Sequence, residues 1–109
     1  MKREFIRTAT FERSWSAAGF GDKELRELEN MLLLNPSSGT VIPHLSGARK
    51  IRFAPEGRGK SGGARVIYVD IVMKERMYLL LAYPKNAQAS LTPDQTRIIR
   101  NLIDALREG

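Results

Sequence analysis

Hydrophobic residues recur at helical spacing near the start of the chain. Residues 2–7 first form a short strand-like run. Phe11, Trp15 and Ala18 then stand at positions i, i+4 and i+7, which is the spacing of one helix face. Either of the two threonines just before Phe11 has a hydroxyl that can cap this helix. The pattern therefore predicts a strand followed by a short helix.

A second helix is predicted after a glycine-rich break at residues 19–21. Asp22 is placed to cap it, and Asn35-Pro36 ends it, because proline disfavours helical backbone in the residue before it. Val41-Ile42 then begins an extended connection. The apolar stripe of this helix repeats every three or four residues: Leu25, Leu28 and Leu32.

The middle of the chain has the pattern of β-strands. Residues 50–54, 64–72 and 77–83 each form a strand-like run. A loop at residues 55–63, with four glycines, joins the first two runs, and a polar turn at residues 73–76 joins the last two. Short connections of this kind predict an antiparallel meander.

The last helix carries several signals at its start. Thr92, Pro93 and Gln95 supply an N-cap, a proline at the first helical position and a capping-box glutamine. Its broad apolar face consists of Ile98, Ile99, Leu102, Ile103 and Leu106. The element order is thus β-α-α-β-β-β-α. We predict one α+β domain over residues 1–109, with the helices packed on one side of an antiparallel sheet.

Composition narrows the classes of function. The chain has no cysteine, which removes disulfides, thiolate zinc sites and cysteine nucleophiles and is consistent with a reducing cytoplasm. The apolar run at residues 78–83 is too short to cross a bilayer, and the N-terminus lacks the apolar core of a signal peptide. We therefore expect a cytoplasmic protein with no membrane partner. The single histidine, His44, excludes a two-histidine acid–base pair within one chain.

Positive charge is concentrated in one segment. The whole chain has a formal net charge of +6. Residues 49–65 hold six basic residues and one acid, Glu56, so this segment alone has a net charge of +5. Phosphate is the natural ligand for such a surface, which makes nucleic acid the first candidate partner. The basic residues are Arg49, Lys50, Arg52, Arg58, Lys60 and Arg65.

Part of this segment imitates a nucleotide-binding motif. Residues 54–61, APEGRGKS, are one glycine short of a Walker A sequence. A P-loop also needs a helix directly after the motif, whose N-terminus binds the phosphates, whereas Ser61 is followed by two glycines and a strand. We interpret the glycines as a hairpin loop that is either simply flexible or lets RNA approach the backbone.

Strand alternation gives the basic residues a geometry. Lys50 and Arg52 share one face of their strand. Arg65 has the same parity as Ile67 and Val69, so simple alternation would turn it toward the core if these two residues face the core. A bulge after Gly62-Gly63, or an open end of the sheet beyond the core, would resolve this conflict.

A cluster of lysines and arginines can perform RNA cleavage without a metal. The reaction needs a base near the 2′-hydroxyl, positive charge at the scissile phosphate and an acid at the leaving oxygen. Arginine holds phosphate oxygens with its fork of donors, and lysine can transfer protons when neighbouring positive charges lower its pKa. The plainer alternative is that these residues only bind phosphate.

Three stretches together resemble the RelE superfamily of bacterial toxins. They are residues 45–52 (LSGARKIR), 57–68 (GRGKSGGARVIY) and 78–86 (YLLLAYPKN). The combination of G-K-x-G-G-x-R-[VI]-I-Y with Y-x-K-N is most similar to the HigB-type branch of type II toxin–antitoxin systems. The resemblance covers nearly the whole chain and implies the compact RelE-type fold.

The resemblance implies a metal-independent, cofactor-free endoribonuclease that cuts mRNA in the ribosomal A site. By motif position, it implies catalytic roles for Lys50, Arg52, Arg65 and Lys85. It implies binding of RNA or the ribosome by Arg49, Arg58, Lys60 and Asn86. Some members of the superfamily use a tyrosine near the C-terminus, where this chain has Leu91-Thr92-Pro93 and no tyrosine after Tyr83. The residue that moves the proton is therefore left open among Lys50, Arg52 and Lys85.

The resemblance also implies a cognate antitoxin, usually with a helix-turn-helix domain. DNA would then be bound only through the toxin–antitoxin complex. The antitoxin could cover residues 49–65 or bind the N-terminal helices. Two other functions remain open from the sequence, a ParE-type gyrase poison and an RNA-binding module without catalysis.

Overall fold

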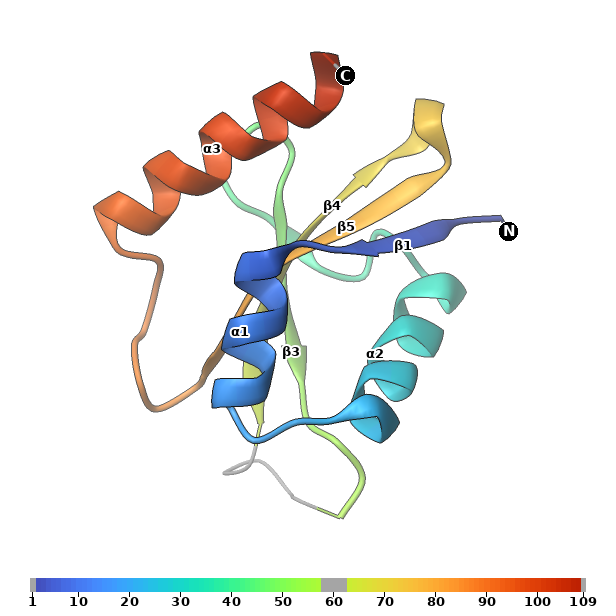
Figure 1. Cartoon of the computed structure of the whole chain (residues 1–109), viewed down its shortest axis with the longest axis vertical. Coiled ribbons are helices and arrows are strands. Elements are labelled where there is room, and N and C mark those ends of the chain that lie inside the picture. The colour runs from blue at the N-terminus through green and yellow to red at the C-terminus, as the bar shows by residue number, and fades with distance from the viewer. Residues whose placement is uncertain (1, 58–62, 109) are drawn as a thin grey trace.

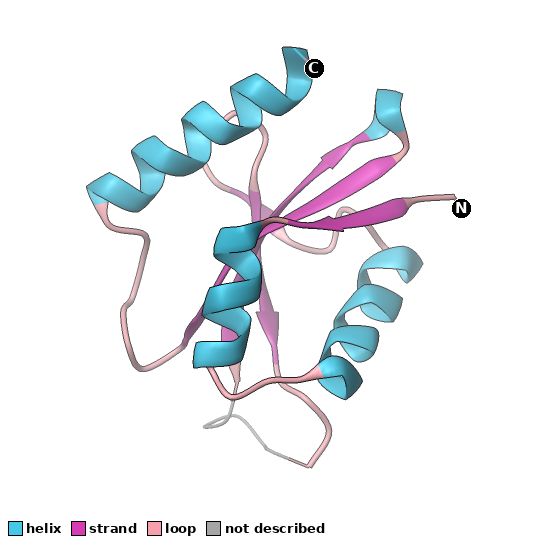
Figure 2. Ribbon diagram, viewed as in Figure 1, coloured by secondary structure: helices cyan, strands magenta, loops and turns pink. Residues whose placement is uncertain are grey.

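The structure is a computed structural model that describes residues 2–57 and 63–108 (Figures 1 and 2). The predicted α+β class and the predicted order of the longer elements are confirmed. A short strand, β2, forms where an extended segment was expected. The elements in chain order are β1 (Glu4–Arg7), α1 (Ala9–Ala17), α2 (Asp22–Leu34), β2 (Thr40–Val41), β3 (Arg49–Phe53), β4 (Ala64–Ile71), the 3-10 helix η2 (Val72–Lys74), β5 (Arg76–Pro84) and α3 (Pro93–Glu108).

Helices α1 and α3 begin as the sequence predicts. The Thr8 hydroxyl caps α1 by accepting the backbone N–H of Phe11 at 3.1 Å. At the start of α3, the Thr92 hydroxyl accepts the N–H of Gln95 at 3.1 Å, and the Gln95 side chain accepts the N–H of Thr92 at 3.0 Å. This reciprocal pair satisfies two backbone donors that a helix start would leave without partners.

The cap predicted for α2 is wrong by one residue. Asp22 lies inside the first turn, and Gly21 is the N-cap. The Glu24 side chain accepts the backbone N–H of Gly21 at 2.7 Å, so a carboxylate from within the helix serves the start of α2. Asp22 still lies where a negative charge favours the helix dipole.

The five strands form one sheet in the order β1-β5-β4-β3-β2. Strands β2 to β5 pair antiparallel with their neighbours, whereas β1 runs parallel to β5 at the edge. Between β4 and β5 the register shifts, because Ile67 pairs with Leu81 and Tyr68 pairs with Leu79. Leu80 is therefore an extra residue of β5, as in a β-bulge.

The core forms two clusters on opposite faces of the sheet, because successive strand residues point to opposite sides. One cluster joins residues of α1 and α2 to Val66 and Tyr68 of β4. The other joins Ile99 and Ile103 of α3 to Ile67 of β4 and its neighbours. Thus α1 and α2 share one side, and α3 packs against the strand residues of opposite parity. No helix in the described part of the chain is long and apolar enough to span a membrane.

Tyr68 ties the segment between α2 and β2 to the middle of the sheet. Its side chain is fully buried, with 0% of its surface exposed. The hydroxyl donates to the carbonyl of Pro36 at 2.8 Å and accepts the N–H of Gly39 at 3.0 Å. A Cβ at Gly39 would come within 2.9 Å of the Tyr68 ring, so glycine is required for this close approach.

We expect Tyr68→Phe to lower the free energy of unfolding by about 1–3 kcal/mol, because it leaves a buried donor and a carbonyl without partners. Urea unfolding followed by circular dichroism measures this change. Ser37→Ala, in the exposed part of the same segment, is the control and should change stability by less than about 0.5 kcal/mol. Equal stability of Tyr68→Phe and wild type would contradict the anchoring role.

Candidate nucleic-acid interface

Lys50 and Arg52 lie on the face of the sheet that α3 partly covers. Their neighbours Ile51 and Phe53 point to the other face, into the cluster with α1 and α2. In the antiparallel register of β3 and β4, Arg52 pairs with Arg65. Directly paired residues share a face, so the three cations lie on one surface.

The open end of the sheet explains the position of Arg65. Arg65 shares its face with Ile67 and Val69, as its parity requires, and these two residues pack in the cluster with α3. Arg65 stands near the start of β4, at the end of this cluster, and is only half-buried. No bulge near residue 63 is needed, because alternation is regular in β4 and the register shift lies between Ile67 and Tyr68.

Two adjoining hollows bring the four proposed catalytic residues together. Lys50, Arg52 and Arg65 border a hollow of about 500 Å³. Arg52 and Arg65 also border a second hollow of about 170 Å³, which Lys85 reaches from the end of β5. The backbone N–H of Lys85 donates to the carbonyl of Gly63 at 3.4 Å, which holds Lys85 beside the start of β4.

The surroundings of these cations favour an anionic ligand. The described residues that border the two hollows include no Asp or Glu. The ion pairs of the described residues join Arg3 to Asp70, Arg76 to Glu4 and Arg97 to Asp94, and none involves the four cations. The positive charge at this end of the sheet is therefore not neutralised within the described part of the protein, and an RNA phosphate would be attracted to it.

Arg49 lies apart from this surface. It pairs with Tyr68 and so points to the opposite face from Lys50. Its guanidinium donates to the carbonyl of Gly39 at 2.7 Å and to that of Ser37 at 3.3 Å. The side chain of Arg49 thus binds the segment before β2.

The remaining proposed binding residues are distributed differently. Asn86 is exposed in the turn that follows β5 and borders neither hollow. Arg58 and Lys60 lie outside the described residues. His44 is exposed, and Trp15 is buried in a cluster of aromatic rings that includes Phe53.

Tyr83 is the neighbour of the cation cluster that the sequence did not single out for a role. It pairs with Arg65 across β4 and β5 and belongs to the cluster with α3. Burial raises the pKa of the Tyr83 hydroxyl, while the charge of Arg65 partly opposes this rise. A phenol with a raised pKa stays neutral at physiological pH, so Tyr83 does not supply a phenolate base.

Small residues complete the larger hollow. Ser38, Thr40 and Ala89 border it together with the cations. Thr40 pairs with Lys50, which places it on the same face. Sequence alone could not find these residues, because the two-residue strand β2 is too short to show a period.

Comparison with known proteins supports the fold. The sequence matches no protein-family model. The structure is similar to a solved structure of the toxin RelE from E. coli, a double arginine-to-alanine mutant in the free state, with a TM-score of 0.57 and 15% sequence identity. The match covers 82% of this chain and 90% of that chain. The fold is RelE-like. At this level of identity the likeness concerns the fold alone.

Two adjacent residues should respond oppositely to substitution. Lys50→Ala should weaken RNA binding with little change in stability. It should also reduce the slope of the logarithm of the binding constant against the logarithm of the salt concentration by about one. Arg49→Ala should leave RNA affinity unchanged and lower the free energy of unfolding by about 1–3 kcal/mol, because two carbonyls lose a charged donor. Fluorescence anisotropy of a labelled single-stranded RNA at several salt concentrations, and urea unfolding, measure the two effects. The assignment of faces is wrong if Arg49→Ala weakens RNA binding as strongly as Lys50→Ala.

Proposed function

We propose that this protein is a RelE-type toxin that cuts mRNA on the ribosome. The observation that carries the proposal is the convergence of Lys50, Arg52, Arg65 and Lys85 at the uncovered end of the sheet. The RelE-like fold supports it, as do the two sequence motifs around Arg65 and Lys85. The same motifs favour the HigB-type branch.

The proposed reaction breaks the bond between phosphorus and the 5′-oxygen of the next nucleotide. The 2′-hydroxyl of the preceding ribose loses its proton to a base and attacks the phosphorus. An acid gives a proton to the departing 5′-oxygen. The products are a 2′,3′-cyclic phosphate and a 5′-hydroxyl end, so the reaction consumes no water and needs no redox partner. Arg65, paired with Arg52, stabilises the charge that develops on the phosphate oxygens.

Lys50 and Lys85 are the candidates for the two proton transfers. Attack and departure take place on opposite sides of the phosphorus, so a base and an acid at different positions are required. Lys50 borders the larger hollow and Lys85 the smaller one, while both arginines border both hollows. A phosphate held by the arginines would therefore have a lysine in each of the adjoining hollows. We propose no metal in this mechanism.

The ribosome is the proposed site of action, which places the protein in the cytoplasm. In this proposal Arg58, Lys60 and Asn86 contribute contacts to ribosomal RNA or mRNA. Arg49 makes no RNA contact in this proposal, because its guanidinium donates to the carbonyls of Gly39 and Ser37 and the residue points to the opposite face of the sheet.

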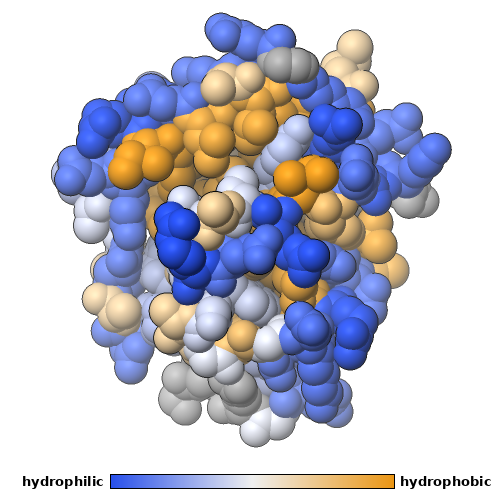
Figure 3. All heavy atoms as spheres, viewed as in Figure 1, coloured by the Kyte–Doolittle hydropathy of each residue, from blue (hydrophilic) through white to orange (hydrophobic). Residues whose placement is uncertain are grey.

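A cognate antitoxin is the proposed partner, since a nuclease that attacks translation would otherwise stop growth of its own cell. Figure 3 shows a broad hydrophobic area beside α3. Ile98 on α3 is 50% exposed, and Leu102 and Leu106 are only partly buried. A segment with apolar and acidic residues would cover this area and complement the net charge of +6. Contact with DNA would come only through the antitoxin, which we propose to be of the helix-turn-helix type.

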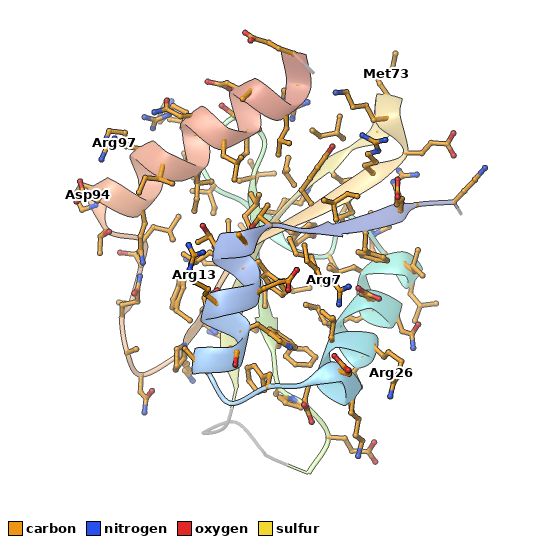
Figure 4. The ribbon with its side chains drawn as sticks, viewed as in Figure 1. Arg7, Arg13, Arg26, Met73, Asp94 and Arg97 are labelled. Carbon is orange, nitrogen blue, oxygen red and sulfur yellow. The ribbon has the colours of Figure 1, made fainter. Side chains whose placement is uncertain are left out.

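The function is tested with purified protein and ribosomes programmed with a defined mRNA. We expect cleavage of the mRNA without metal beyond what the ribosomes require, and Arg65→Ala should reduce the rate by about 100- to 1,000-fold. Arg26→Ala is the matched control. The substitution removes the same charge, and Arg26 points outward from α2 (Figure 4). Intact mRNA together with inhibition of gyrase would assign the protein to the ParE-type class. Salt-sensitive RNA binding without cleavage would leave only an RNA-binding module.

Partner binding is tested by co-expression with the neighbouring small open reading frame. Growth should be restored, and the two proteins should purify together. Ile98→Asp should weaken the complex, because it places a charge in the apolar area, whereas Asn30→Asp on α2 adds the same charge elsewhere and should not. The reverse pattern would place the antitoxin on the N-terminal helices. Persistent toxicity with no co-purifying protein would contradict the toxin–antitoxin assignment.

A further inference from the structure

Tyr83 carries a buried hydroxyl with no partner among the described residues. Only 4% of the residue is exposed, and its oxygen makes no hydrogen bond to the described part of the protein. A buried polar group without a partner destabilises a fold by about 1–3 kcal/mol. Such groups are rare in folded proteins, so a role outside folding is the natural explanation.

The other two tyrosines show that this situation is specific to Tyr83. Tyr68 is bonded to Pro36 and Gly39, as described above. Tyr78 lies on the same strand and in the same core cluster as Tyr83 and is also 4% exposed, but its side chain interacts with Arg76 and raises the pKa of that guanidinium. Tyr78 and Tyr83 are therefore a matched pair, and of the two only Tyr83 has a buried hydroxyl without a partner among the described residues.

The neighbour of Tyr83 suggests what the hydroxyl is for. Tyr83 and Arg65 are direct cross-strand partners, so their Cβ atoms lie about 4.5–5.5 Å apart. Arg65 is half-buried and borders both hollows, and its charge acts on the Tyr83 hydroxyl by opposing the rise in pKa that burial causes. Burial keeps the Tyr83 hydroxyl itself out of reach of RNA.

We propose that Tyr83 is a positioning residue for Arg65, whose guanidinium donates one N–H to the Tyr83 hydroxyl when its other N–H groups hold an RNA phosphate. Arginine has five donors in a planar fork, and a phosphate uses two of them, so one remains for the phenol. The bond fixes the orientation of the fork and gives the buried oxygen a partner only in the bound state. This inference rests on the proposed function.

The test compares Tyr83→Phe with Tyr78→Phe, each in the wild-type and the Arg65→Ala background. Tyr83→Phe should keep or raise the free energy of unfolding, because it removes an unsatisfied hydroxyl. It should also reduce the cleavage rate at saturating ribosomes about tenfold, the effect of losing one hydrogen bond to a charged group. Tyr78→Phe should do the opposite, with lower stability and normal cleavage.

The double variants decide whether Tyr83 acts through Arg65. Tyr83→Phe should have no further effect once Arg65 is alanine. Wild-type cleavage by Tyr83→Phe, or an equal loss in both backgrounds, would overturn the inference and leave the proposed function intact.

If the wild-type protein does not cleave mRNA, RNA binding still tests the positioning role of Tyr83 separately from the proposed nuclease function. A labelled single-stranded RNA then serves as the probe. Weaker binding by Tyr83→Phe only when Arg65 is present would support the positioning role although the nuclease proposal has failed. Equal binding by wild type and Tyr83→Phe, or no binding by either, would overturn the positioning role as well.

Discussion

The pairing of Arg52 with Arg65 across β3 and β4 is the contact on which the whole site depends. Like charges directly opposite each other destabilise a sheet, so this pair opposes folding by a fraction of a kcal/mol to about 1 kcal/mol. An anion between the two guanidinium groups removes the repulsion and adds attraction.

The register of β3 and β4 is held from the other side of the sheet. Phe53 packs against Trp15 and Phe20, and Val66 lies in the same cluster. A slip of one residue would turn this apolar set toward solvent and the arginines toward the aromatic core, which makes the register strongly preferred. The geometry of the cations is therefore set by hydrophobic packing that no ligand touches.

Sequence reasoning succeeded where the signal was local. Alternation placed Lys50 and Arg52 on one face, and the spacing of Thr92 and Gln95 predicted the start of α3. It failed where the answer depends on distant segments. The alternation of residues along β4 predicted the face on which Arg65 lies. It could not predict the point at which α3 ceases to cover that face.

Two hydrogen-bonding patterns show the same limit. Arg49 looks like its basic neighbours in the sequence, and only the approach of Gly39 reveals that it binds carbonyl oxygens. The unsatisfied hydroxyl of Tyr83 depends on the contacts around it, which no local pattern encodes.

The parallel edge strand β1 has consequences for when the fold can be completed. Its residues 4–7 pair with residues 76–79, and the Thr8 hydroxyl donates to the carbonyl of Leu79 at 3.0 Å. These contacts join segments about 71 residues apart in the sequence, and such non-local pairing makes folding slow. The first strand to be synthesised has no partner in the sheet until the last strand exists. A nascent chain therefore cannot close its sheet before residues 76–79 have been synthesised, because β1 has no strand to pair with until then.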